Sequence, residues 1–148
     1  MTHYGTISEA NLYFAGRLHN WDWSNADADT RIRALTEATE LIDQFDFLDQ
    51  KAVESQELAF PRTGQIEAPV QIKRACFLIA QDMIGGRNPS ADFENLALKT
   101  EVFAGLRAEH ERGGNPQEHL NNLIPNVQAW NLIRPWLRIV KNFTWNRV

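Results

Sequence analysis

Few side chains in this sequence have the type and spacing that catalysis or metal binding requires. With a single cysteine, Cys76, the chain can form neither a cysteine-based zinc framework nor an internal disulfide. The carboxylate pairs Asp27/Asp29 and Glu109/Glu111 lie in acidic contexts that are typical of helix caps and solvated faces. The histidines, which do not have the spacing of metal ligands, are His3, His19, His110 and His119.

The short motifs that carry phosphate binding or nucleophilic catalysis are also absent. The sequence contains no G-x-G-x-x-G, no G-x-x-x-x-G-K-[ST] and no G-x-S-x-G. We therefore expect no catalytic residue, no metal and no cofactor, and a protein that is not an enzyme. Its function is then expected to be binding or assembly.

Binding chemistry is concentrated at the C-terminal end of the chain. Arginine and aromatic side chains are favoured at protein interfaces, and basic aromatic segments also bind nucleic acids. We predict that residues 138–148 form an extended arm that either folds back on its own domain or docks on a partner. The side chains that carry the docking prediction are Arg138, Lys141, Phe143, Trp145 and Arg147.

A second aromatic pair, Trp21 and Trp23, is open to two interpretations. Two nearby tryptophans can stack on nucleobases. Asp22 lies between them, however, and further acidic residues follow, so packing between the flanking helices is favoured.

Charge is divided unevenly along this chain of 148 residues, whose length fits one domain. Residues 1–60 carry 11 acidic and four basic side chains, whereas residues 61–148 carry 11 basic and eight acidic ones. The net charge of −4 argues against a nucleic-acid footprint over the whole domain. No apolar run is long enough for a membrane span, and Met1–Tyr4 does not begin a signal peptide, so synthesis in the cytoplasm is expected.

Hydrophobic periodicity predicts a mainly α-helical domain of about four helices. Thr6 and Glu9 have the spacing of a capping box. Asn20–Asn25 is predicted to be a loop, and residues 88–112 are compatible with either a helix or a hairpin. The predicted helices are Ile7–Leu18, Ala26–Phe45, Val70–Ile84 after Pro69 and before Gly85, and Asn126–Arg134 before Pro135.

Between two of these helices, the segment Gln56–Gly64 has an extended pattern. Phe60 is predicted to anchor a short edge strand of a hairpin excursion, and Pro61 to end it because proline has no backbone donor. Arg62 is expected near the surface, and Gly64 allows a turn. The domain organisation expected is 1–137 for the helical domain and 138–148 for the arm.

Several segments together carry a family resemblance. The most specific is Gln56–Gly64, with its aromatic-Pro-Arg-x-Gly pattern, although the family more often has tryptophan at the position of Phe60. The match is good over about residues 4–80 and loose after Gly85. The other segments are Tyr4-Gly5-Thr6 with Ala10 and Tyr13, Ala34-Leu35 with Ala38 and Leu41-Ile42-Asp43, and Ile72-Lys73-Arg74-Ala75.

These segments resemble a family of small tailed-phage proteins labelled DnaT-like single-stranded-DNA-binding protein, and the layout is similar to that of head–tail connector (adaptor) proteins. The resemblance to connectors implies a structural virion protein at the head–tail interface of a bacteriophage. Its copies would form a ring, a homododecamer, in the neck. Its partners would be the portal and a neck, tail-terminator or tail-tube protein, with DNA passing through the ring without sequence-specific binding.

Two functions follow from the resemblance. In the first, the protein is a connector whose arm, residues 138–148, docks on the portal. In the second, the DnaT-like label is literal, and the protein binds single-stranded DNA in replication. The acidic balance of the chain favours the connector interpretation, so we expect that function and keep single-stranded DNA binding as the alternative.

Overall fold

The computed structural model describes residues 2–95 and 118–138 of the 148-residue chain. These residues are mainly helical, as the sequence predicts. No helix in this part of the chain is long and apolar enough to cross a membrane. The named helices are α1 (Ile7–Ala15), α2 (Trp21–Asn25), α3 (Ala28–Asp43), α4 (Val70–Ile84), α6 (Glu118–Asn121), α7 (Val127–Ile133) and the 3₁₀ turn η1 (Arg134–Trp136), and residues 89–95 are also helical.

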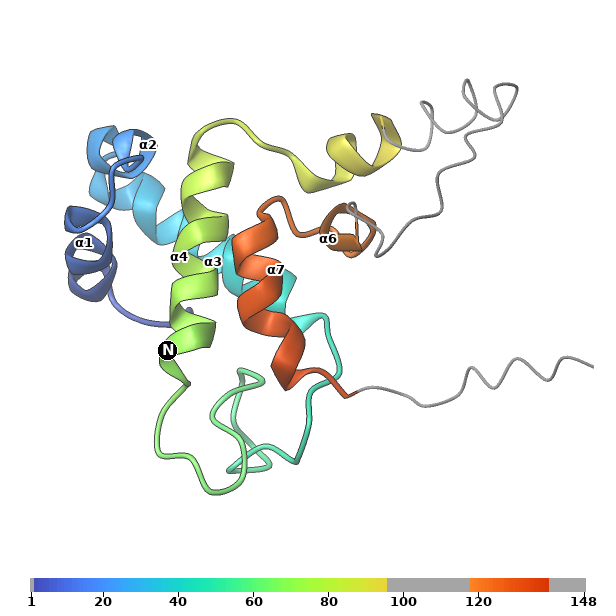
Figure 1. The fold of residues 1–148 in the computed structure, drawn as a ribbon. Helices are drawn as coiled ribbons and strands as arrows, with labels where there is room; N and C mark the ends of the chain where they lie inside the picture. The colour runs from blue at the N-terminus through green and yellow to red at the C-terminus, as the bar shows by residue number, and fades with distance from the viewer. Residues whose placement is uncertain (1, 96–117, 139–148) are drawn as a thin grey trace, which may run out of the picture.

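The central element is α4, which lies between α1 and α7 with α3 behind it (Figure 1). Its bounds, Val70–Ile84, agree with the prediction, and Gly85 ends it. Buried side chains cover most of its circumference and include those of Ile72 and the run 75–80. The stripe of α4 between α1 and α7 contains Arg74, which is exposed, and Gln81, which is half-buried, with the buried side chains of Phe77 and Leu78 between them.

The other predicted helices are present with shifted ends. The capping box is confirmed, because Thr6 Oγ1 accepts from Glu9 N at 3.1 Å and Glu9 Oε2 accepts from Thr6 N at 2.7 Å. Asp27 caps α3 by accepting from Thr30 N at 2.7 Å, so this helix begins later than predicted. The helix predicted at Asn126–Arg134 is α7, and the chain continues through Pro135 as the 3₁₀ turn η1.

The predicted loop at Asn20–Asn25 is wrong, because the segment forms the short helix α2. Burial of Trp23 stabilises it. This side chain is 1% exposed, lies against Phe14 with ring centres 5.2 Å apart, and donates from Nε1 to Asn11 Oδ1 at 2.9 Å. Trp23 therefore packs between helices as expected, whereas Trp21 is 77% exposed.

The predicted edge strand within Gln56–Gly64 is also wrong. Only the isolated bridge of Lys51 with Arg62 pairs main chain with main chain, with Ala52 N donating to Pro61 O at 3.0 Å and Thr63 N to Gln50 O at 2.8 Å. The backbone donors before it bind side chains. Ala59 N donates to Asp43 Oδ2 at 3.1 Å, and Phe60 N donates to the hydroxyl oxygen of Tyr4 at 3.1 Å. That hydroxyl itself donates to Asp43 Oδ1. Burial, with Asp43 as acceptor, raises the pKa of Tyr4, and burial raises the pKa of Asp43 against the opposing effect of the Tyr4 hydrogen bond.

Arg62 is buried, contrary to the prediction that it stays near the surface. Its side chain satisfies three main-chain oxygens, donating to Leu48 O at 2.9 Å, to Ala59 O at 3.0 Å and to Phe47 O at 2.9 Å. The guanidinium also lies 5.8 Å from the ring centres of Phe47 and Phe60. Five donors on a planar group allow one side chain to close a loop in this way.

Phe60 is 2% exposed and packs among aromatic rings from other parts of the chain. It lies edge-on to Tyr4, Phe47 and Trp136, with ring centres 4.7 to 6.0 Å apart. Instead of a hairpin, the described residues contain only isolated bridges, which pair Phe47 with Leu137 and Lys51 with Arg62. Residues 96–117 and the arm beyond Arg138 lie outside the described residues, and the division at 137/138 stays a prediction.

Replacing Arg62 by methionine tests the loop closure. The substitution keeps the length of the side chain but removes every donor, and each stranded oxygen costs about 1–3 kcal/mol. We expect the free energy of unfolding to fall by about 3 kcal/mol in urea titrations followed by circular dichroism. Arg33→Met, at an exposed position of α3, is the matched control and should change stability by less than about 0.5 kcal/mol. Equal effects of the two substitutions would contradict the closure of the loop by Arg62.

Candidate nucleic-acid interface

The surface stripe of α4 is bordered by two hollows. The α1–α4 hollow has a volume of about 410 Å³, and the α4–α7 hollow has one of about 450 Å³. The first is lined by Glu9, Leu12, Tyr13, Glu67, Val70, Lys73, Arg74 and Phe77. The second is lined by Arg17, His19, Leu78, Gln81, Asp82, Arg87, His119, Pro125, Asn126, Val127 and Gln128.

Tyr13 and two arginines form a cation–aromatic cluster beside the α1–α4 hollow. The guanidinium carbon of Arg17 lies 5.0 Å from the centre of the Tyr13 ring, and that of Arg74 lies 5.9 Å from it. Arg17 Nη1 also donates to the Tyr13 hydroxyl at 2.9 Å. Tyr13 and Arg17 are four residues apart, so one side of α1 and its C-terminal end presents both.

Arg17 connects the two hollows. Its Nη2 donates to Gln128 Oε1 on α7 at 2.9 Å, and its side chain lines the α4–α7 hollow. Within the described residues, neither Arg17 nor Arg74 forms an ion pair with a carboxylate.

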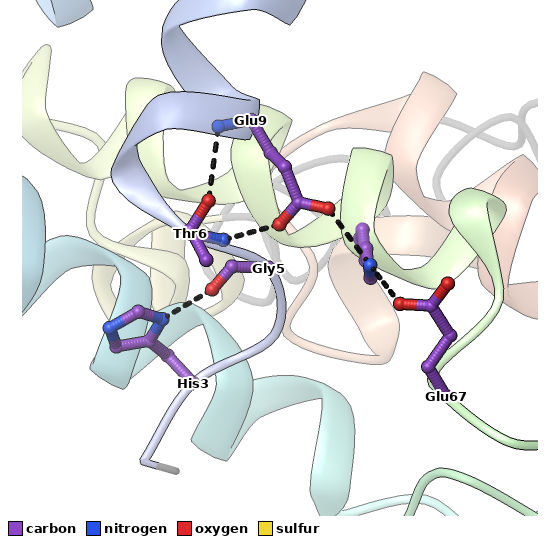
Figure 2. A network of polar contacts seen from close by, with 6 residues as sticks. His3, Gly5, Thr6, Glu9 and Glu67 are labelled. Atoms are coloured by element: carbon purple, nitrogen blue, oxygen red, sulfur yellow. Dashed lines mark hydrogen bonds and ion pairs between the residues drawn. The ribbon is translucent and has the colours of Figure 1, made fainter.

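Lys73 differs from these arginines because two carboxylates bind it. Its Nζ donates to Glu9 Oε1 at 2.9 Å and to Glu67 Oε2 at 2.8 Å, which joins the first turn of α1 to α4 and to the preceding loop. Figure 2 shows Glu9 both in this network and in the capping box with Thr6. Lys73 lowers the pKa of Glu9, and Glu67 and Glu9 raise the pKa of Lys73.

The α4–α7 hollow contains two titratable side chains, Asp82 and His119, whose pKa values are shifted in opposite directions. Asp82 Oδ2 accepts from Asn126 Nδ2 at 2.9 Å, and burial raises the pKa of this carboxyl while Asn126 opposes the shift. Burial, with the charge of Arg87 nearby, lowers the pKa of His119 and so favours its neutral form. Gln81 Nε2 donates to His19 O at 2.7 Å, which holds α4 against the chain between α1 and α2.

The acidic side chains of α3 lie away from this surface. The face of α3 that contains Ala34, Leu35, Ala38 and Ile42 is buried. Because a helix advances about 100° per residue, Asp29, Glu37 and Glu40 fall on the opposite face, and all three are exposed. The hollows, in contrast, lie beside α1 and α7.

Of the residues predicted to bind a partner, only Arg138 belongs to the part of the chain that the structure describes. Arg138 is described, and it is tied to the loop after α3 through Asp46, with 3.7 Å between Arg138 Nε and Asp46 Oδ2. The other four, Lys141, Phe143, Trp145 and Arg147, lie beyond the described residues. Within residues 2–95 and 118–138, no group of three or more histidine, cysteine or carboxylate side chains is placed to hold a metal ion.

Sequence reasoning missed the cluster of Tyr13, Arg17 and Arg74. The spacing of Tyr13 and Arg17 was a usable signal, because side chains four residues apart on a helix face the same way. Arg74 had no comparable signal, since its place beside Tyr13 depends on how α1 packs on α4. Of the motif residues Phe60, Pro61, Arg62 and Gly64, Phe60 and Arg62 are buried in the loop before α4, and the role of the motif stays a prediction.

A family model described as "Putative DnaT-like ssDNA binding protein" matches residues 3–109. No curated protein and no solved structure matches the chain. The match corrects the connector interpretation: the family is one of DnaT-like single-stranded-DNA-binding proteins and not of phage head–tail connectors, so the predicted virion function is wrong. The connector interpretation relied on the net charge of the whole chain. A net charge does not show how the charges are distributed over the faces of the domain. The ring, the portal and neck partners and the virion location stay predictions.

The ion pairs of Lys73 predict how stability depends on pH. The folded-state pKa of Glu9 is lowered from its ordinary value of 4.5, so its contribution is present above that value and is lost as the pH falls through the lowered pKa. The stability advantage of the native chain over Lys73→Met should therefore be clear at neutral pH and shrink below about pH 4. Urea midpoints measured across this range check the effect, with Arg33→Met as the control. A difference independent of pH would refute it.

Proposed function

We propose that the protein binds single-stranded DNA at the surface formed by α1, α4 and α7, since the chain belongs to the family of DnaT-like ssDNA-binding proteins. In this proposal the protein acts by binding, without catalysis. The strand follows the stripe of α4 from the α1–α4 hollow to the α4–α7 hollow.

The observation that carries the proposal is the cluster of Tyr13, Arg17 and Arg74. Single-stranded DNA is bound by aromatic rings that stack on bases and by cations that track the phosphates. Tyr13 offers the ring, and the two arginines lie 5.0 and 5.9 Å from its centre. Leu12 and Val70, which are 77% and 55% exposed, add apolar surface in the same hollow.

The distribution of charge supports this location. Among the described residues, the acids of the α1–α4 hollow, Glu9 and Glu67, are both paired with Lys73. Arg17 also lines the second hollow, together with one further arginine, Arg87, whose Nε is paired with Asp92 at 2.9 Å. A domain with a net charge of −4 can therefore still present a local cationic path to a phosphate backbone.

We include the C-terminal segment in the proposed interface. Lys141 and Arg147 would contact phosphates, and Phe143 and Trp145 would stack on bases. The partner predicted for this arm from its basic and aromatic side chains is, in this proposal, single-stranded DNA. In this proposal residues 139–148 are an extended arm, and Arg138, held at Asp46, marks where it leaves the domain.

The arginine pair is tested by fluorescence anisotropy with a labelled oligothymidine at several salt concentrations. Each phosphate contact on a single strand contributes about −0.7 to the slope of log K against log salt concentration. The double substitution Arg17→Ala, Arg74→Ala should weaken binding and reduce the magnitude of the slope by about 1.4. Arg33→Ala, on the exposed face of α3, should leave both unchanged. If the double variant and the control bind alike, the proposed surface is wrong.

The arm is tested by ending the chain at Arg138. The shortened protein keeps the contact with Asp46 and should unfold at the same temperature as the full chain. Loss of Lys141 and Arg147 should reduce the magnitude of the same salt slope by about 1.4, and loss of stacking should weaken binding further. Equal affinities of the shortened and full chains would exclude the arm from the interface.

A further inference from the structure

We infer that the α4–α7 hollow is a subsite for one nucleobase that carries an exocyclic amino group, with cytosine preferred over thymine. This inference rests on the proposed binding of single-stranded DNA and adds a base preference to it. It depends on three features of the hollow, which are its size and apolar wall, the fixed carboxylate of Asp82, and the arginines at its edge.

The hollow has the size of a small-molecule site, and an apolar wall lies within its mainly polar lining. Its volume of about 450 Å³ lies within the range of roughly 300–1,000 Å³ that is usual for ligand pockets. Leu78 and Pro125 are buried and provide an apolar wall, and Val127 is 50% exposed at the first position of α7. A planar, weakly polar base is matched to such walls.

Asp82 provides an acceptor whose orientation is fixed. Its Oδ2 accepts from Asn126 Nδ2 at 2.9 Å, while Asn126 Oδ1 accepts from Ala129 N at 3.0 Å as the cap of α7. Among the hydrogen bonds of the described residues, the second oxygen of Asp82 accepts none. A carboxylate oxygen accepts well from the N4 amino group of cytosine, whereas thymine presents the O4 carbonyl at the same position.

The arginines place this acceptor on the path of the strand. Arg17 contacts Tyr13 on one side and lines the α4–α7 hollow on the other, so the phosphate that it binds would join a base stacked on Tyr13 to a base in the hollow. Arg87 lies at the same hollow, and its Nε is paired with Asp92 at 2.9 Å and not with Asp82. The carboxylate of Asp82 therefore keeps an oxygen that can accept from the base.

The experiment compares two labelled oligonucleotides of about 15 residues with the full-length protein at neutral pH. One contains only thymidine, and the other alternates thymidine with deoxycytidine, which avoids folded cytosine structures. We expect the second to bind about tenfold more tightly, a factor within the range that one hydrogen bond to a charged group supplies. Equal affinities for the native protein would overturn the inference.

Two variants locate the preference. Asp82→Asn keeps an oxygen for Asn126 but puts an amide donor where the free carboxylate oxygen stood, so the ratio of affinities should fall to about one or below. Val127→Trp fills the hollow from an exposed position and should remove the preference, so that the two oligonucleotides bind this variant alike. A preference that survives both substitutions would exclude the hollow as its source.

The outcomes separate this inference from the proposed function. If the native protein binds both oligonucleotides equally, and binding still depends on Arg17 and Arg74, the proposed function stands and the subsite is wrong. If neither oligonucleotide binds, both fail. Circular dichroism of each variant confirms that a lost preference does not reflect a lost fold.

Discussion

Burial of α4 on most of its circumference is the constraint on which the rest of the structure depends. A helix with apolar side chains at 72 and throughout 75–80 must be covered by other elements, and α3, α7, α2 and α1 provide that cover. The polar side chains of α4 that are exposed or half-buried are Gln71, Lys73, Arg74, Gln81 and Asp82, and two of them, Arg74 and Gln81, lie on the stripe between α1 and α7. The same burial that stabilises the domain therefore decides which side chains can meet a ligand, and it brings residues of α1 and α7 to the borders of that stripe.

The loop before α4 is ordered by a different interaction, the binding of main-chain groups by buried polar side chains. Asp43 and Tyr4 hold the donors of Ala59 and Phe60, and Arg62 holds three carbonyl oxygens. Buried polar groups of this kind are costly when one partner is missing, so the arrangement fixes a single loop conformation. The loop leads to Pro69 and the first turn of α4, where Lys73 forms ion pairs with Glu67 and Glu9.

Local signals explain what could be predicted from the sequence. The capping box of Thr6 and Glu9 and the bounds of α4 depend on residues close in the chain, and both predictions are confirmed. The edge strand and the exposed Arg62 were wrong because contacts distant in sequence decide them; Phe60 N, for example, binds the hydroxyl of Tyr4, 56 residues away. The candidate site also depends on contacts between residues that are distant in sequence. Net charge argued against nucleic-acid binding, whereas α3 holds its exposed acids on the face opposite its buried side.

Lys73 and Arg17 are held by different kinds of partner. The difference determines which of the two positive charges is used within the domain and which is open to a ligand. Lys73 is surrounded by two carboxylates, and its charge is used to join α1 to α4. Arg17 is held instead by neutral groups, the ring and hydroxyl of Tyr13 and the amide oxygen of Gln128. Such partners restrict the side chain without cancelling its charge, so a phosphate would meet a cation that is already oriented and would incur a smaller entropy cost on binding. Because Gln128 belongs to α7 and Tyr13 to α1, this orientation exists only when both helices are packed on α4.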